Sequence, residues 1–282
     1  MRQALLAALA AAALVAAVSA SAAGGVKPDR MPEANLTDLA SLQSGARTFV
    51  NYCLNCHGAS LMRYNALREI GLTEEQIQQN LMFTAEKVGM PMSIAMSAKD
   101  AKEWFGTAPP DLSVIARSRG ADWLYSYLRT FYRDAATPTG WNNKVYSNVG
   151  MPHVLWQLQG TRGATVETVR ADRHPETEKV TGYTKTTALL DRAGVKTETA
   201  QKLADGKEHG EGVTVTLAKP EAGQLSAAQY DKTVYELVSF LVWMGEPHQL
   251  ARKRLGVWVL FGLAVLIFFA YALKLAYWKD VH

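Results

Sequence analysis

The sequence predicts a mainly α protein with long loops, followed by one C-terminal transmembrane helix. Three segments carry apolar residues at spacings of three and four, Pro- and Gly-rich stretches separate them, and both ends of the chain are strongly apolar. The 282 residues are 48% hydrophobic and 20% charged, which allows a sizeable core and excludes a mainly disordered chain. The net charge of +4 comes without a stripe of Arg and Lys interleaved with aromatic residues, so no nucleic acid partner is expected.

The first residues, 1–22, predict a secretory signal peptide. Arg2 supplies a basic start, a run of Ala, Leu and Val extends from Ala4 to Val18, and small residues follow as far as Ala23. A buried Ala-rich helix is the alternative, but the segment has neither a helix cap nor a polar face. The mature chain is therefore expected to begin near Ala23 and to be exported.

The three amphipathic segments predict helices over residues 38–52, 121–132 and 227–244. Capping boxes at Thr73–Gln76 and Ser226–Gln229 mark two helix starts. The helix over 38–52 leads directly into both cysteines of the chain, and it is expected to give them a rigid platform.

Residues 160–222 are expected to form an irregular insertion within an exported domain of residues 23–250. Thr, Lys, Glu and Gly dominate this stretch. Only Val213, Val215 and Leu217 alternate like a short strand. The insertion is therefore not expected to be a separate domain.

Residues 251–282 predict a membrane anchor with a short cytoplasmic tail. Roughly 19 residues, Leu255–Leu273, carry no formal charge, and at about 1.5 Å per residue they nearly match a hydrocarbon core of about 30 Å. Three cations at 252–254 precede the span and two, Lys274 and Lys279, follow it, which locally opposes the positive-inside bias. The export signal is expected to override this imbalance and to leave the preceding domain outside the cytoplasm.

Both cysteines lie in the motif Cys53-Leu54-Asn55-Cys56-His57, which is the attachment signature of a c-type haem. On one turn of backbone, the two thiols reach the two vinyl groups of a porphyrin edge and form thioethers. The imidazole of His57 then lies under the iron as its proximal ligand. The sequence thus predicts a monohaem, cytochrome c-like domain with one covalently attached haem c.

Other roles for the motif are disfavoured. A thioredoxin-like C-x-x-C belongs in a βαβ context, which this sequence lacks. A zinc site needs four ligands, and no second Cys/His pair stands at metal-ligand spacing.

The sixth iron ligand stays open at this point, between a methionine, a histidine and no protein ligand. A thioether opposite His57 raises the reduction potential and suits electron transfer rather than oxygen chemistry. Met151 stands out because Gly150 and Pro152 flank it in a loop, with the cluster of methionines at 90–96 close behind. The full set of candidates is Met62, Met82, Met90, Met92, Met96, Met151, Met244, His153, His174, His209 and His248.

Taken together, these features resemble the cytochrome c1 family, whose members are the haem subunits of ubiquinol–cytochrome c reductase. The resemblance covers nearly the whole mature chain except about 160–222. It rests on the order of five blocks: Cys53-Leu54-Asn55-Cys56-His57, Pro109-Pro110-Asp111-Leu112-Ser113 followed by Arg117 and Arg119, Met151-Pro152, Trp243 through Glu246-Pro247-His248, and Arg252-Lys253-Arg254-Leu255-Gly256.

The resemblance implies that Met151 binds iron, that the segment containing Pro110 packs beside the haem, and that Arg119 approaches a haem propionate. The sequence also departs from the family in two places. Trp123 stands where a tyrosine often lies near the propionates, so a propionate hydrogen bond is not expected there. His153 stands where a second proline often follows the ligand methionine, which makes it the competing axial ligand.

The function implied by the resemblance is single-electron relay within a ubiquinol–cytochrome c oxidoreductase. Electrons would arrive from a Rieske iron–sulfur protein and leave to a cytochrome c, with cytochrome b as a further partner in the membrane complex. The haem domain would lie on the periplasmic side of the inner membrane, and no bond-making residue is needed because the cofactor performs the redox step.

Two rival functions remain. A free-standing, membrane-tethered cytochrome c shuttle is expected to have a flexible linker before its span, whereas the helix over 227–244 is followed by the span within about ten residues. A haem oxidase or peroxidase would leave the sixth iron position open.

Overall fold

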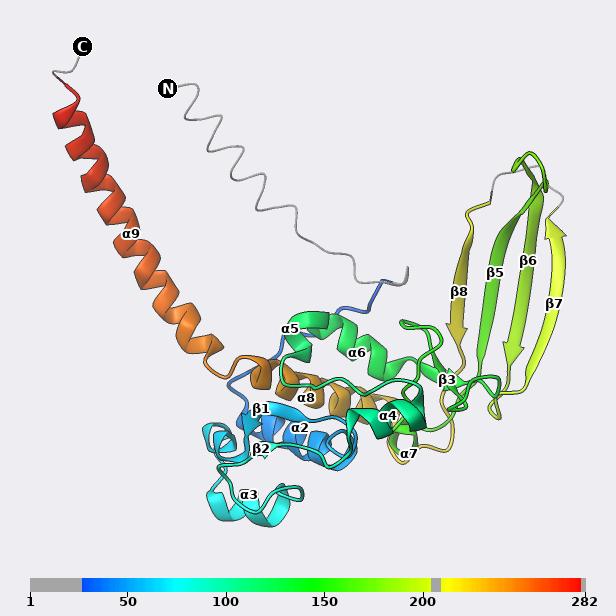
Figure 1. Ribbon diagram of the computed structural model, residues 1–282, viewed down its shortest axis with the longest axis horizontal. Coiled ribbons are helices and arrows are strands. Elements are labelled where there is room, and N and C mark those ends of the chain that lie inside the picture. The colour runs from blue at the N-terminus through cyan, green and yellow to red at the C-terminus, as the bar shows by residue number, and fades with distance from the viewer. Residues whose placement is uncertain (1–26, 204–208, 280–282) are drawn as a thin grey trace.

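The computed structural model describes residues 27–203 and 209–279. The predicted signal peptide, residues 1–22, lies outside the described residues. Figure 1 shows a helical body from which a long helix, α9, leaves on one side and a β-sheet projects on the other. The body contains the two cysteines, so it is the part that positions the predicted site.

The helical body is built from short helices around two longer ones. Its helices are α2 (Leu39–Tyr52), the 3₁₀ helix η1 (Tyr64–Ile70), α3 (Glu74–Asn80), α4 (Ala98–Phe105), α5 (Ile115–Arg119), α6 (Ala121–Arg129), α7 (Trp156–Gln159) and α8 (Ala227–Gly245).

Helices α2 and α8 pack directly against each other at the centre of the core. Gly45 allows this close approach, because a Cβ atom there would lie 2.2 Å from the carbonyl oxygen of Glu236. One turn further along α2, the ring of Phe49 lies 5.6 Å from the ring of Phe240, and both side chains are fully buried. This contact fixes the C-terminal end of α2, where the cysteines begin, on a rigid support.

The predicted helix starts are confirmed. Thr73 and Ser226 each accept a hydrogen bond from a backbone N–H three residues later, and the glutamines at those positions bond back, so both capping boxes are formed. The predicted helices over 38–52 and 227–244 correspond to α2 and α8. The prediction over 121–132 is too long, because α6 ends at Arg129 and Phe131 starts a strand.

The predicted mainly α class is wrong, because the described residues contain three antiparallel sheets. One pairs β1 (Ala59–Arg63) with β2 (Pro91–Met92), and a second pairs β3 (Phe131–Arg133) with β4 (Trp141–Asn143). The third has four strands in the order β7-β6-β5-β8, and its members are β5 (Ala164–Arg173), β6 (Val180–Leu190), β7 (Lys196–Leu203) and β8 (Gly212–Leu217).

The four-stranded sheet also corrects the interpretation of residues 160–222 as irregular. Most of its side chains are exposed or half-buried on both faces, and Thr, Lys and Glu occupy many of its positions. A sheet that is polar on both faces has no alternation of apolar and polar residues, so the usual signal of a strand is missing. Only β8, which matches the predicted short strand, carries alternating apolar residues.

A small second core joins the sheet to the body. Tyr132 of β3 is buried together with Ala164, Leu190 and Val215, which come from three strands of the sheet. The sheet is therefore seated on the β3–β4 hairpin.

The last helix, α9 (Gln249–Tyr277), contains the predicted span over 255–273. Its most apolar window has a mean hydropathy of 2.4, and none of that window is buried against the rest of the protein. Glu246 ends α8 and accepts hydrogen bonds from the guanidinium of Arg252 in the first turn of α9. The two helices are thus joined by three residues and an ion pair, and no flexible linker separates them.

Candidate functional site

The C-x-x-C-H motif forms a closed turn at the C-terminal end of α2. The N–H of Cys53 donates to the carbonyl of Phe49 at 2.8 Å, which continues the helix by one residue. The N–H groups of Cys56 and His57 then both donate to the carbonyl of Cys53, at 3.1 and 2.9 Å. Both sulfurs and the imidazole are therefore held on one turn of backbone, as attachment of a porphyrin edge requires.

The two cysteines do not form a disulfide with each other. Burial, and to a smaller extent the neighbouring Cys56, raises the pKa of the Cys53 thiol to about 12. A reactive C-x-x-C of a disulfide oxidoreductase has the opposite property, a lowered thiol pKa. Among the described residues, no three His, Cys, Asp or Glu side chains cluster as metal ligands would. Thiol exchange and zinc binding are both disfavoured by these observations.

The imidazole of His57 is oriented by the proline-rich segment. Its Nδ1 lies 2.7 Å from the carbonyl oxygen of Pro110 and donates to it, which leaves Nε2 with a free lone pair. Burial lowers the pKa of His57, although the bond to Pro110 and the charge of Asp111 oppose that effect. A neutral imidazole with Nδ1–H bonded to a carbonyl is the usual arrangement of a metal-binding histidine. The structure thus gives the predicted residue Pro110 a specific contact.

Asp111 fastens this segment to the residues that follow His57. Its two carboxylate oxygens accept from the N–H groups of Ser60 and Ser113, both at 2.8 Å, and the Ser113 hydroxyl accepts from the N–H of Leu61. Burial acts to raise the pKa of Asp111, but the hydrogen bonds from Ser113 and Ser60 outweigh it and lower the pKa. No separate role for Asp111 is apparent from the motif in the sequence, although the spacing Asp-x-Ser is typical of an Asx turn and could have indicated one.

Met151 lies half-buried in the loop after β4. Its sulfur accepts a hydrogen bond from the hydroxyl of Tyr127 at 3.4 Å. The preceding Gly150 lies against the segment that leads to Pro110, since a Cβ atom there would be 3.4 Å from the methyl carbon of Thr107. The stretch 105–110 therefore contacts both the Met151 loop and the His57 imidazole, and it brings the two predicted iron ligands to one region of the body.

Arg119, Trp123, Tyr127 and Met151 form a continuous row of contacting side chains from the end of α5 along α6. The guanidinium of Arg119 lies 5.3 Å from the ring of Trp123, which stacks on Tyr127 at 4.8 Å with an angle of 11°. Trp123 and Tyr127 are spaced by four and share one face of α6, and the Tyr127 hydroxyl reaches the Met151 sulfur. The indole N–H of Trp123 is buried and has no hydrogen-bond partner among the described residues.

The other candidate methionines differ in their exposure. Met62, Met92 and Met244 are buried in the main core, Met82 and Met96 are half-buried, and Met90 is exposed. His153 is also buried, and its Nε2 bonds to Gln159 at 2.7 Å.

Burial lowers the pKa of His153 to about 3, the bond to Gln159 opposes this effect, and Arg162 adds to it. The remaining histidines are His174 in the β5–β6 turn, His209 shortly before β8, and His248 at the junction of α8 and α9.

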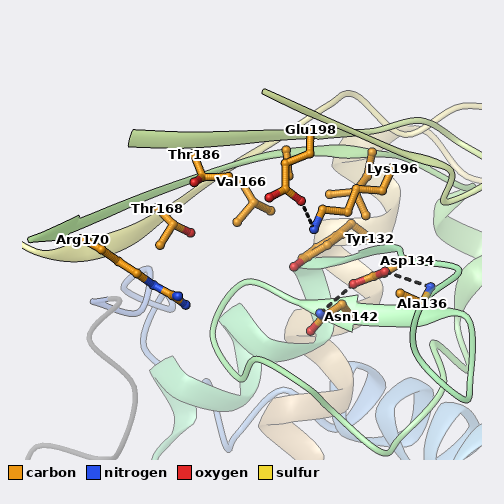
Figure 2. Close-up of a pocket in the computed structure, with 12 residues that line it drawn as sticks. Tyr132, Asp134, Ala136, Asn142, Val166, Thr168, Arg170, Thr186, Lys196 and Glu198 are labelled. Carbon is orange, nitrogen blue, oxygen red and sulfur yellow. Dashed lines mark hydrogen bonds and ion pairs between the residues drawn. The ribbon is translucent and has the colours of Figure 1, made fainter. Parts of the chain in front are cut away.

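The structure also has an open groove of about 310 Å³ between the four-stranded sheet and the β3–β4 hairpin. Figure 2 shows side chains of Tyr132, Asp134 and Asn142 facing the sheet, where Lys196 and Glu198 form an ion pair. None of the predicted site residues lines this groove. It is therefore separate from the site around Cys53.

A closed C-x-x-C-H turn, an oriented imidazole, a thioether in a neighbouring loop and an exposed apolar helix are the features of a membrane-anchored c-type cytochrome. Comparison with known proteins gives the family. Residues 33–281 match the model of the Cytochrome C1 family, and the chain belongs to that family.

Individual relatives agree over most of their length. The chain is 40% identical over 262 residues to cytochrome c1 of Allochromatium vinosum, covering 93% of each chain. It is 27% identical over 266 residues to cytochrome c1 of Rhodospirillum rubrum, covering 86% of this chain and 83% of that one. It is also 40% identical over 257 residues to a protein of Nitrosomonas europaea named ammonia monooxygenase gamma subunit, covering 91% of this chain and 90% of that one.

Family membership establishes the cofactor and the general function. The protein carries one covalently bound haem c and is an electron-transfer subunit of the cytochrome bc1 complex, ubiquinol–cytochrome c reductase, together with cytochrome b. The single apolar C-terminal helix fits a membrane-anchored cytochrome c1.

Proposed function

We propose that Cys53 and Cys56 would hold the haem through thioethers, and that His57 and Met151 would be the protein ligands of its iron. The observation that carries this proposal is the hydrogen bond from His57 Nδ1 to the Pro110 carbonyl, because it places the proton on Nδ1 and leaves the lone pair of Nε2 available to a metal. When bound, the haem supplies a one-electron carrier whose iron cycles between two oxidation states. The protein residues hold and orient it and set its potential.

The described residues fit such a group. The thiol of Cys53 is buried at the rigid end of α2, and Cys56 is half-buried in the same turn. A buried indole N–H without an acceptor costs about 1–3 kcal/mol, so the N–H of Trp123 is explained if an acceptor arrives with the haem. This reverses the expectation from the sequence that no haem hydrogen bond forms at Trp123. Arg119 stacks on the same indole and would bring a positive charge to the acidic edge of the porphyrin.

The roles of the ligands follow from their chemistry. The Pro110 carbonyl makes His57 a better electron donor by accepting its Nδ1 proton in a hydrogen bond. Met151 provides a weaker, softer ligand, which favours the reduced iron and raises the potential. A six-coordinate iron of this kind passes electrons without binding oxygen. An oxidase or peroxidase role is disfavoured for that reason.

We further infer the partners and the side of the membrane. Electrons arrive from a Rieske iron–sulfur protein and leave to a cytochrome c, and the haem domain lies on the periplasmic side of the inner membrane. The predicted export signal at residues 1–22 supports this orientation. The short junction between α8 and α9, closed by Glu246 and Arg252, holds the domain firmly at the membrane surface, which favours a complex subunit over a tethered shuttle.

Purification of the full-length chain from membranes in mild detergent tests this function. We expect one covalent haem per chain, co-purification with a b-type haem protein and an iron–sulfur protein, and quinol-dependent reduction of cytochrome c. A monomer that transfers electrons at the full rate without these partners would support the shuttle. Co-purification with monooxygenase subunits would instead support the role named for the Nitrosomonas europaea relative.

A further inference from the structure

His153 follows Met151 by two residues and is packed into the β3–β4 hairpin. It is 2% exposed. Its ring stacks on Phe131 at 4.8 Å with an angle of 2°, and it meets the ring of Trp141 edge-on at 5.1 Å. The imidazole is therefore held on two sides by aromatic residues of the hairpin.

A hydrogen bond holds the same ring on a third side. The Nε2 of His153 lies 2.7 Å from the Oε1 of Gln159, and the Nε2 of Gln159 donates to the carbonyl of Arg129 at 3.1 Å. The bond to Arg129 fixes which end of the amide accepts, so Nε2 of His153 must be the donor. His153 is thus linked to the end of α6 through one buried side chain.

The other end of the Met151 loop is attached to the same hairpin. The amide oxygen of Asn142 accepts from the N–H of Asn148 at 2.9 Å, and that of Asn143 accepts from the N–H of Val145 at 2.8 Å. Asn148 adopts a left-handed backbone with φ of 55°, which asparagine tolerates. Between this attachment and His153 only residues 149–152 remain, and the fixed φ of Pro152 stiffens them.

We propose that His153 and Gln159 form a latch that holds the Met151 sulfur at the iron. The proposal rests on the proposed axial role of Met151. His153 is a positioning residue in this account: it makes no bond to iron and acts through the short, stiff chain to Met151. A methionine–iron bond is weak, so the fraction of iron that keeps it depends on how firmly the protein holds the loop.

The test compares two variants of the full-length haem protein. His153→Phe keeps an aromatic ring on Phe131 but removes the hydrogen bond, and Gln159→Leu removes the acceptor while keeping His153. The readout is the midpoint pH at which the near-infrared methionine–iron band of the oxidised protein disappears as the pH is raised. It is measured well below the unfolding temperature. His174→Phe, at an exposed histidine in the β5–β6 turn, is the matched control.

We expect both variants to lose the band at a pH about one unit lower than the parent, a tenfold increase in the equilibrium for Met151 dissociation, equivalent to about 1.4 kcal/mol. The double variant is expected to shift no further than either single variant, because both changes remove the same bond. The control is expected to match the parent.

Three results bear on the proposal differently. An unchanged midpoint in both variants, even with a lower unfolding temperature, would overturn the latch and leave His153 a purely structural residue. Loss of the band at every pH in His153→Phe, with retention in Met151→Leu, would make His153 the ligand and overturn the axial assignment itself. If His153→Phe does not fold, Gln159→Leu alone decides, since it leaves the aromatic packing in place.

Discussion

His57 and Met151 face the same predicted cofactor, but the protein holds them by different means. His57 belongs to a closed turn that continues α2, so backbone hydrogen bonds place its main chain, and the Pro110 carbonyl orients its ring. Met151 lies in a loop whose two ends are attached by buried side chains from β4 and α7. One ligand residue is placed by backbone hydrogen bonds of a turn, and the other by side-chain hydrogen bonds at the two ends of its loop.

This difference suits the chemistry of the two bonds. The imidazole is the stronger ligand and stays bound in both oxidation states, so a rigid turn serves it well. The thioether is weak, and its strength sets the potential, so contacts around it can adjust function without disturbing the attachment of the haem. Changes on the His57 side are therefore expected to have larger effects than changes on the Met151 side.

The largest expected effect is on attachment. Replacing Cys53 and Cys56 with Ala removes both thioethers, so no haem should remain on the chain after denaturation. Haem staining of a denaturing gel and the intact mass of the chain measure this directly. Asn55→Ala is the matched control, because Asn55 lies inside the same motif, is exposed, and donates a hydrogen bond to the carbonyl of Asn51. Covalent haem on the double variant would contradict the account.

A smaller effect is expected where the His57 side is fastened. Asp111→Ala removes the acceptor of two backbone N–H groups and should lower the free energy of unfolding by about 1–2 kcal/mol, or the unfolding temperature by about 2–8 °C. Asp111→Asn keeps one of the two acceptors, so its free energy of unfolding should lie between those of the parent and Asp111→Ala.

The contribution of Asp111 to the free energy of unfolding also depends on pH in a defined direction. The folded state lowers the pKa of Asp111, so its contribution is present above the ordinary pKa of about 3.9 and is lost as pH falls further. Thermal unfolding at pH 7 and near pH 3 should therefore show the difference between parent and Asp111→Ala shrink in acid. An equal difference at both pH values would mean that Asp111 acts through something other than its charge.

The smallest effect is expected beside the thioether. Tyr127→Phe removes the hydroxyl that donates to the sulfur of Met151 and should lower the reduction potential by roughly 30 mV, which is about 0.7 kcal/mol for one electron. Tyr183→Phe, at a tyrosine of β6 in the four-stranded sheet, is the control and should leave the potential unchanged. A redox titration of both variants decides whether the hydroxyl matters.

Much of the helical body could be predicted from local sequence. The capping boxes at Thr73 and Ser226, the apolar faces of α2 and α8, and the exposed helix α9 all depend on spacings of three and four within one segment. The sheet over 164–217 could not be predicted in this way. It carries polar residues on both faces, and its stability comes from pairing between strands and from the small core around Tyr132.

The residues of the site likewise differ in whether local sequence could predict them. The C-x-x-C-H turn is contiguous, so Cys53, Cys56 and His57 were apparent from the sequence. The sequence left many methionines and histidines open as the sixth ligand. The flanking Gly150 and Pro152 made Met151 the leading candidate, and the resemblance to a family favoured it further. The contacts of Pro110 with His57, and of Gln159 with His153, join residues that only the folded chain brings together.

The near-infrared spectrum of the oxidised Met151→Leu protein tests the account most directly. Leucine keeps nearly the same volume, so the fold should be preserved while the sulfur is lost. We predict that the methionine–iron band disappears, and that it persists in Met90→Leu, which changes an exposed methionine among the rival candidates. A band that persists in Met151→Leu would place the sixth ligand elsewhere and contradict the central claim.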